Sequence, residues 1–285
     1  MTSLKEIEEY YNRSEKSSLQ NSISVVNQLD DTLPSKFTYL YKNTYDISVE
    51  DRDIYDTFEC SCKSCSSNSN CCFQTGGYWR HMPYKDSFRH TVLRNPLKSP
   101  PCIFECGARC LCAKNCLNRE TQNGIKHHLE VFKDASLGWS LRTLGFIFKG
   151  EFVVEYTGMI VSKDVADKMP AKNKTYQFAI DPMNCETEKY VIDGEKQGNI
   201  SRFINSRCVD ANLIAKHVYS TTKSELSRIC FFAVRDIQPR EPLNYDYFSM
   251  LHILGITCLC NSTYCQENVQ PIAFDNVPRL SRSLR

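Results

Sequence analysis

The segment from Gly198 to Cys208 carries side chains suited to bind a polar ligand. Its sequence, GNISRFINSRC, mixes apolar positions with Arg202 and Asn205, whose side chains hydrogen-bond, and it ends in a cysteine that can act as a thiolate ligand. The stretch LNYDY at 243–247 adds two tyrosines close to an asparagine and an aspartate. Together these residues predict the wall of a cofactor site.

Sixteen cysteines form the second group of residues that could do chemistry. The N-terminus lacks the apolar core of a signal peptide, which predicts an intracellular protein in which clustered cysteines are metal ligands rather than disulfides. Nine of them lie in two clusters on either side of a 33-residue insert. Nine thiolates fill the twelve ligand positions of three tetrahedral zinc ions if three of them bridge two metals each. A disulfide scaffold and independent zinc fingers are the alternatives, and the lack of paired histidines argues against fingers.

Length and charge limit the classes of function. The chain has 285 residues, 41% of them hydrophobic, and can therefore bury a core of enzyme size. Its net charge of +2 predicts no strong direct binding to nucleic acid, and no apolar run is long enough to cross a membrane.

Two kinds of element must position these residues. Residues 1–29 are polar, with four apolar or aromatic residues spaced for one side of a short helix, and residues 34–40 alternate as a strand does. From Val131 onward, short apolar runs at 146–148, 152–156 and 229–234 are separated by turn residues. These runs predict a mostly β domain. One helix is expected at residues 162–168, with Ser162 as its N-cap and Pro170 just past its end.

Five motifs, in order, resemble those of SET-domain lysine methyltransferases. GWSLR at 138–142 resembles G-W-G-x-R, EYTG at 155–158 resembles E-Y-x-G, and TYQF at 175–178 resembles Y-x-F. RFINSRC at 202–208 and YDY at 245–247 resemble the R-F-x-N-H-x-C-x-P-N and F/Y-D-Y segments, which cross in that family to form one site. With the cysteine clusters, the resemblance covers roughly residues 30 to 270 and is to the Su(var)3-9 class.

The resemblance implies a mostly β fold, the SET-domain β-clip, with a cysteine-rich zinc-cluster pre-SET module and a small post-SET zinc site. The implied parts are an N-terminal arm at 1–29, a pre-SET module at 30–127, a SET catalytic domain at 128–250, a post-SET segment at 251–270 and a tail at 271–285.

The metal ligands follow from the same resemblance. Three zinc ions in the pre-SET module are expected on nine cysteines, and one post-SET zinc on Cys208 with three later cysteines. Cys102 falls outside the nine and is expected to be a buried thiol, while His81 and His90 are expected at the surface. Metal binding would supply the folding free energy of this polar segment. The full set is Cys60, Cys62, Cys65, Cys71, Cys72, Cys106, Cys110, Cys112, Cys116, Cys208, Cys258, Cys260 and Cys265.

The implied reaction passes a methyl group from S-adenosylmethionine to a lysine ε-amine, which must be neutral to attack. Deprotonating a lysine of pKa about 10.4 near neutral pH costs roughly 4 kcal/mol, and an apolar aromatic tunnel lowers that cost. Tyr247 is expected to orient the amine, with Tyr156, Tyr176 and Tyr245 lining the tunnel. The expected cofactor-binding residues are Gly138, Trp139, Ser140, Tyr176, Arg202, Asn205 and Ser206.

The implied substrate is a histone H3 tail, as peptide or nucleosome, with lysine 9 as the target residue. Tyr245 stands where phenylalanine accompanies trimethylation in the family, and its hydroxyl favours mono- or dimethylation. A histone substrate implies a nuclear, chromatin-associated protein.

The sequence departs from the family pattern in the cofactor site. Ser140 stands in place of the second glycine, Ser206 in place of the histidine, and one extra residue and no proline precede Asn212. If its backbone needs positive φ, Ser140 costs about 1 kcal/mol or more. These changes leave open a second interpretation, a SET protein that has lost catalysis and acts as a zinc-braced chromatin-binding subunit. A nucleic-acid-binding zinc protein is disfavoured by the near-neutral charge.

Overall fold

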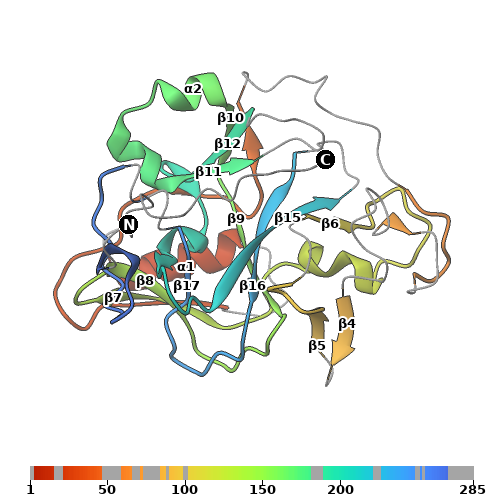
Figure 1. Cartoon of the computed structure of the whole chain (residues 1–285), viewed down its shortest axis with the longest axis horizontal. Helices are drawn as coiled ribbons and strands as arrows, with labels where there is room; N and C mark the ends of the chain where they lie inside the picture. Colours follow the sequence, from red (N-terminus) through yellow and green to blue (C-terminus); the bar gives the residue numbers. More distant parts are fainter. Residues whose placement is uncertain are drawn as a thin grey trace, which may run out of the picture.

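The computed structural model of the chain describes residues 3–15, 22–46, 59–65, 71–72, 84–87, 90–98, 102–180, 189–220, 226–247, 251 and 254–268. Strands dominate these residues, which confirms the predicted mostly β fold (Figure 1). The described residues form one three-stranded sheet, two four-stranded sheets and three two-stranded pairings. No helix in this described part is long and apolar enough to cross a membrane.

The largest pairing surface belongs to a four-stranded sheet in the order β6-β15-β16-β9. These strands are Cys102–Glu105, Leu213–Ser220, Arg228–Ala233 and Phe152–Tyr156. β16 has a neighbour on each side, and Ile229 to Ala233 are fully buried, as the uninterrupted apolar run predicts. The predicted strands at 152–156 and 229–234 are therefore confirmed within one residue.

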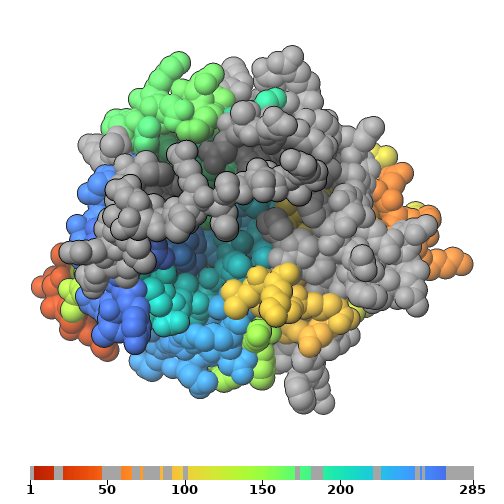
Figure 2. All heavy atoms as spheres, viewed as in Figure 1, coloured from red at the N-terminus to blue at the C-terminus, as the bar shows by residue number. Residues whose placement is uncertain are grey.

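A second sheet has the order β11-β12-β10-β3, formed by Gln177–Ile180, Tyr190–Asp193, Met159–Ser162 and Thr44–Tyr45. Helix α2, Lys163–Asp167, follows β10 and confirms the predicted helix, although the Ser162 side chain makes no capping hydrogen bond to it. Figure 2 shows α2, in green, at one edge of the molecule, away from the yellow residues near β5. The predicted run at 146–148 is not a strand. Ile147 alone makes a β-bridge, to Ile237, because turns flank it on both sides.

The N-terminal segment adds strands to the sheets of the later chain. β1, Ile23–Val26, pairs in parallel with β7, Leu129–Asp134, in the order β1-β7-β8, where β8 is Gly138–Thr143. β2, Thr38–Tyr39, pairs with β13, Gln197–Gly198, so that only two residues of the predicted strand at 34–40 are extended and paired. The N-terminal segment is thus built into the main core.

Helix α1, Leu4–Ser14, covers the free edge of β1. Ser3 caps its first turn by accepting from the Glu6 N–H, and Ile7 and Tyr11, four residues apart, are buried. Asn12 accepts from the Ile23 N–H at 3.0 Å and donates to its carbonyl at 2.6 Å. These bonds take the place of a neighbouring strand. The predicted short N-terminal helix is confirmed.

The pre-SET region joins the large sheet through β6, which pairs in parallel with β15. Its other elements are β4, Tyr84–Ser87, β5, His90–Leu93, and the 3₁₀ segment η3, Leu117–Asn123. The remaining short elements are η4, Ala171–Tyr176, η5, Ile200–Phe203, β14, Asn205–Ser206, β17, Asn244–Tyr245, and η6, Gln266–Asn268.

A buried ion network crosses this junction. Glu105 of β6 is fully buried and accepts from Tyr84 Oη at 2.8 Å and the Thr121 N–H at 2.8 Å. Arg228 of β16 pairs with Glu105 at 3.3 Å and with Glu155 of β9 at 2.9 Å. The Arg228 guanidinium therefore pairs with one carboxylate from the pre-SET region and one from the later β domain.

We expect Arg228→Met to lower the free energy of unfolding by about 3 kcal/mol, because it leaves two buried carboxylates without a cation. Urea denaturation measures this change. Lys163→Met is the matched control, since Lys163 pairs with Asp167 in solvent and its loss should cost less than about 0.5 kcal/mol. A wild-type midpoint for Arg228→Met would contradict a stabilising role for the network.

Candidate cofactor and substrate site

The two motif segments predicted to form one site lie side by side. β14 pairs in parallel with β17, placing Asn205 opposite Asn244 and Ser206 opposite Tyr245. The Asn212 side chain donates to the carbonyl of Pro242 at 2.8 Å and accepts from the Asn244 N–H at 2.9 Å, which fixes the crossing. Asp210, within the segment that carries the extra residue before Asn212, has a φ of +56°.

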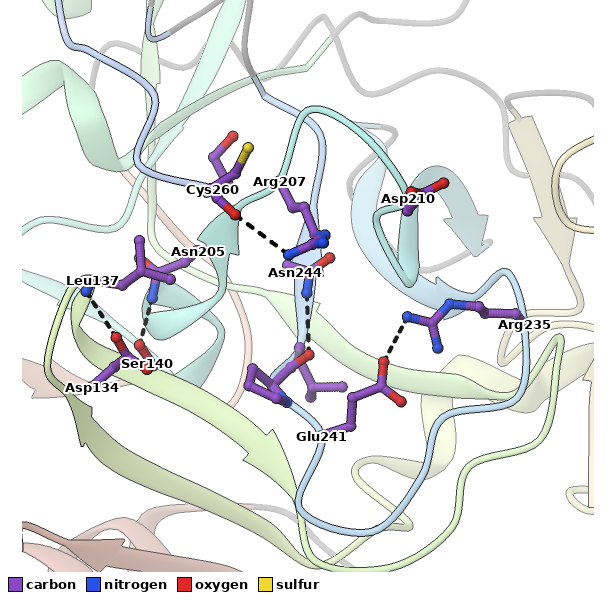
Figure 3. Close-up of a pocket in the computed structure, with 13 residues that line it drawn as sticks. Asp134, Leu137, Ser140, Asn205, Arg207, Asp210, Arg235, Glu241, Asn244 and Cys260 are labelled. Atoms are coloured by element: carbon purple, nitrogen blue, oxygen red, sulfur yellow. Dashed lines mark hydrogen bonds and ion pairs between the residues drawn. The ribbon is translucent and has the colours of Figure 1, made fainter. Parts of the chain in front are cut away.

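A cavity of about 300 Å³ opens beside this crossing (Figure 3). Ser140, Asn205 and Ser206, three of the predicted cofactor-binding residues, line it. The Ser206 hydroxyl is enclosed by protein and has no hydrogen-bond partner among the described residues. The cavity is lined by Asp134, Leu137, Ser140, Asn205, Ser206, Arg207, Asp210, Arg235, Glu241, Pro242, Leu243, Asn244 and Cys260.

The turn between β7 and β8 forms one side of this cavity. Gly138 has a φ of +74°, which explains why glycine stands there. Ser140 does not have positive φ and lies within β8, so its backbone carries no strain of the kind considered from the sequence. Its hydroxyl instead accepts from Asn205 Nδ2 at 2.7 Å (Figure 3).

The charges around the cavity are mixed. Asp134, Asp210 and Glu241 face it together with Arg207 and Arg235, and Arg235 pairs with Glu241 at 2.6 Å. Burial raises the pKa of Asp134, but hydrogen bonds from the Leu137 and Ser136 N–H groups outweigh it and lower that pKa below its usual value. Asp134 is therefore ionised at neutral pH, and the lining suits a ligand with a positive charge.

Arg202 is not among the described residues that line the cavity, although the sequence predicts it as a cofactor ligand. Its guanidinium carbon lies 4.5 Å from the Phe37 ring centroid and 4.3 Å from that of Tyr176, and Nη1 donates to the Glu195 carbonyl at 2.8 Å. Arg202 thus connects the N-terminal segment to η4. Gly138, Trp139 and Tyr176 are likewise absent from the described lining.

Three of the four predicted tyrosines, Tyr156, Tyr245 and Tyr247, gather in one aromatic cluster. Tyr245 has its ring centroid 4.8 Å from Tyr247 and 4.7 Å from Phe231. Phe178 lies 6.1 Å from Tyr245 and 5.7 Å from Tyr156. Tyr156 donates to the Tyr176 carbonyl at 2.6 Å, while the Tyr176 ring packs on Arg202 and not in this cluster.

The hydroxyls of this cluster remain protonated at neutral pH. Burial raises the pKa of Tyr247 to about 12, although the Ser206 backbone, through a hydrogen bond, lowers it. Burial also raises the pKa of Tyr245 and of Tyr156 well above the usual range. The contact between Tyr247 and Ser206 joins the aromatic cluster to the cavity.

The nine pre-SET cysteines converge in one cluster and form no disulfide. Cys106 Sγ lies 3.8 Å from that of Cys60, 3.6 Å from that of Cys65 and 3.4 Å from that of Cys71. Tetrahedral zinc with Zn–S bonds of about 2.3 Å separates its sulfurs by about 3.8 Å, so these distances fit shared metal ions. Cys60 belongs to three overlapping groups of four, as a bridging ligand would.

Cys208, Cys258, Cys260 and Cys265 form a separate group of four buried thiols within 4.8 Å of one another. The Sγ of Cys208 lies 3.6 Å from those of Cys260 and Cys265, again suited to one tetrahedral zinc. Cys260 also lines the cavity, so a metal here would brace the cofactor wall.

Cys102, His81 and His90 are not among the predicted metal ligands; the sequence predicts a buried thiol for Cys102 and surface positions for the two histidines. Cys102 lies apart from the nine, as predicted, but it is half-buried rather than buried because β6 is an edge strand. His81 and the side chain of His90 lie outside the described residues.

Several cavity residues were not predicted from the sequence. Asp134 ends β7, Leu137 lies in the turn before the G-W motif, and Arg207 lies inside a recognised motif at a position without a specified residue. Arg235 and Asp210 carry no local signal, since surface charges of this kind are common. Phe231, which lies in the aromatic cluster and not in the cavity lining, was also missed, because its apolar run cannot be told from core.

Two known family models match this chain. Residues 138–248 match the SET domain, and residues 14–119 match the Pre-SET motif. The chain is a SET-domain protein with a pre-SET motif. The match confirms the resemblance drawn from the five motifs and the pre-SET cysteines, and it includes β14, β17 and the aromatic cluster within the SET domain.

Named relatives belong to the class that the sequence indicated. The chain is 33% identical over 255 residues to "Histone-lysine N-methyltransferase, H3 lysine-9 specific SUVH5" of Arabidopsis thaliana, covering 85% of this chain and 30% of the relative. It is 30% identical over 267 residues to "Histone-lysine N-methyltransferase Su(var)3-9" of Drosophila pseudoobscura pseudoobscura, covering 86% and 41%. The chain therefore spans less than half the length of these relatives.

A solved structure of KRYPTONITE with mCHH DNA, H3(1-15) peptide and SAH has the same fold. The TM-score is 0.65 at 32% identity, and the match covers 79% of this chain and 45% of that one. The fold is thus shared with a structure that contains SAH and an H3 peptide.

Proposed function

We propose that this SET-domain protein transfers a methyl group from S-adenosylmethionine to the ε-amine of a histone lysine. The observation that carries the proposal is the junction of the cavity with the aromatic cluster, through the pairing of Ser206 with Tyr245 and the contact of Ser206 with Tyr247. A cofactor bound on one side of this junction can meet a lysine that enters from the other.

The cavity residues fit the cofactor. S-adenosylmethionine, when bound, supplies an electrophilic methyl on a sulfonium. Ser140, Asn205 and Ser206 line the cavity, Asn205 offers it a hydrogen-bonding side chain, and the ionised Asp134 favours a cationic ligand. Solved relatives, including KRYPTONITE with SAH, hold the product of the same cofactor.

The aromatic cluster prepares the lysine. Its rings pack against the methylene stem and exclude water, which disfavours the ammonium form of the amine. Since the Tyr247 hydroxyl is protonated at neutral pH, it orients the amine by hydrogen bonding and does not act as a general base. The proton of the lysine must therefore leave to solvent before the transfer.

The substrate that we propose is the H3 tail, in a peptide or nucleosome, with lysine 9 as its target. Two observations support it: the relative SUVH5 is named as H3 lysine-9 specific, and KRYPTONITE holds an H3 peptide. In this chain β11 is the edge strand of its described sheet, and Phe178 of β11 packs against Tyr156 and Tyr245. A peptide that adds along β11 as a further strand would bring its lysine to the cluster.

Four zinc ions complete the proposal, three on the nine pre-SET cysteines and one on the post-SET group. Their role is to brace the catalytic domain. The proposed parts remain an arm at 1–29, a pre-SET module at 30–127, a SET domain at 128–250 and a post-SET segment at 251–270. A histone substrate implies work in the nucleus, at chromatin.

Calorimetric titration of the zinc-loaded protein with S-adenosylhomocysteine, followed by mass spectrometry of an H3 peptide incubated with S-adenosylmethionine, tests this function. We expect saturable binding and methyl transfer to lysine 9, with both reduced in Asn205→Ala. No binding by the folded, zinc-replete protein would favour the alternative of a non-catalytic chromatin-binding subunit.

We expect Tyr245→Phe to shift the product from mono- and dimethyllysine towards trimethyllysine. The wild-type hydroxyl lies in the aromatic cluster, where it restricts the space and hydrogen bonding open to a methylated amine. Product ratios by mass spectrometry measure the shift, and Tyr41→Phe, at an exposed tyrosine, is the control. A wild-type enzyme that already yields mostly trimethyllysine would contradict the role given to Tyr245.

A further inference from the structure

Ser140 and Asn205, from different parts of the chain, are in contact at one side of the cavity. Ser140 lies in β8 and is 3% exposed, and Asn205 lies in β14. Asn205 Nδ2 donates to Ser140 Oγ at 2.7 Å, and both residues line the cavity (Figure 3). The family motif has glycine at the position of Ser140, and glycine has no hydroxyl that could accept this hydrogen bond from Asn205.

The single hydroxyl proton of Ser140 determines the orientation of the Asn205 side-chain amide. Ser140 Oγ donates its one proton to the Gly138 carbonyl at 3.2 Å, and Oγ must therefore accept from Asn205. Only the nitrogen of the amide can donate, so the nitrogen faces Ser140. Asn205 Nδ2 also points to the Trp139 carbonyl, at 3.4 Å.

The amide oxygen is consequently the group left for a ligand. Both N–H groups of Asn205 are directed at β8, and no donor among the described residues reaches Oδ1. Oδ1 is not enclosed by protein, since it is absent from the buried polar atoms that lack partners. An acceptor held in this way, beside a cavity, selects a hydrogen-bond donor on the ligand.

We propose that Ser140 is a positioning residue of the cofactor site, which holds the Asn205 amide with its oxygen towards the cavity so that it accepts a hydrogen bond from the cofactor. This inference rests on the proposed function, because it takes the cavity as the cofactor site. The donor belongs either to the ammonium of the amino-acid tail or to the nucleoside. Without the serine hydroxyl, the amide keeps only its long bond to Trp139 and can turn over.

The experiment is a double-mutant cycle read by calorimetry with S-adenosylhomocysteine. We expect Ser140→Ala to weaken binding about 3- to 10-fold, the range of one net hydrogen bond. In the Asn205→Ala background the same substitution should change affinity less than about 2-fold, because Ser140 acts through Asn205. A serine that only stabilised β8 would give equal effects in both backgrounds.

A second titration with 5′-methylthioadenosine, which lacks the amino-acid tail, identifies the donor. If the effect of Ser140→Ala disappears with this ligand, the donor is the ammonium, and if it persists, the donor lies in the nucleoside. Equal losses in both backgrounds, or unchanged affinity in Ser140→Ala, would overturn the role of Ser140 alone. Failure of the wild-type protein to bind S-adenosylhomocysteine would overturn the proposed function together with this inference.

Discussion

The Tyr247→Phe enzyme is expected to methylate its peptide at least about 100-fold more slowly than wild type while binding S-adenosylhomocysteine with nearly unchanged affinity. The substitution removes one hydroxyl from the junction of cavity and aromatic cluster and keeps the ring that packs on Tyr245. Losing one preorganised hydrogen-bonding group at a reacting centre typically costs a factor of 10² to 10³. Single-turnover kinetics with saturating cofactor measure the effect on the chemical step.

The pH dependence of the same reaction provides a second test of the role of the Tyr247 hydroxyl. Since burial raises the pKa of Tyr247 to about 12, its hydroxyl does not ionise between pH 7 and pH 10. The rate should therefore rise with pH as the lysine loses its proton, in wild type and variant alike. Tyr41→Phe and thermal melting control for general damage. A near-wild-type rate for Tyr247→Phe, or a falling rate above pH 8 in a folded wild type, would count against the assignment.

Cys106→Ser is expected to prevent folding of the pre-SET module. The Cys106 sulfur lies within 3.8 Å of those of Cys60, Cys65 and Cys71, so its loss affects more than one metal position. Structural zinc contributes roughly 10 kcal/mol or more to the folding of small modules, which is comparable to the whole stability of a domain. Metal analysis and circular dichroism of the purified variant measure zinc content and folded fraction.

Two other cysteine variants sharpen this test. Cys102→Ser should keep all four zinc ions, because Cys102 lies outside the cluster and is half-buried. Cys208→Ser should lose one zinc and weaken cofactor binding while the pre-SET module stays folded, since its group is separate and Cys260 lines the cavity. Full zinc content and a wild-type melting temperature in Cys106→Ser would refute the shared cluster.

Local chemistry in the sequence was sufficient for much of the site. Short cysteine spacings indicated most ligands of two metal groups, because ligands of one ion must lie within a few ångströms, whereas Cys208, 50 residues before Cys258, was assigned through the family resemblance. The motifs around Asn205 and Tyr245 indicated the two segments that cross. Continuous apolar runs such as that of β16 marked buried strands, since burial on both faces removes alternation.

Tertiary structure alone decided how these parts serve one another. Arg202 belongs to a recognised motif, yet it packs between Phe37 and Tyr176, because a guanidinium finds its partners in space and not along the chain. The pairing of β1, β2 and β3 with strands from much later in the chain could not be read from local periodicity. The hydrogen bond from Asn205 to Ser140 joins residues 65 positions apart. Residue types and spacing thus determined which chemistry this protein carries, whereas long-range packing decided which atoms of the motif residues face the cavity.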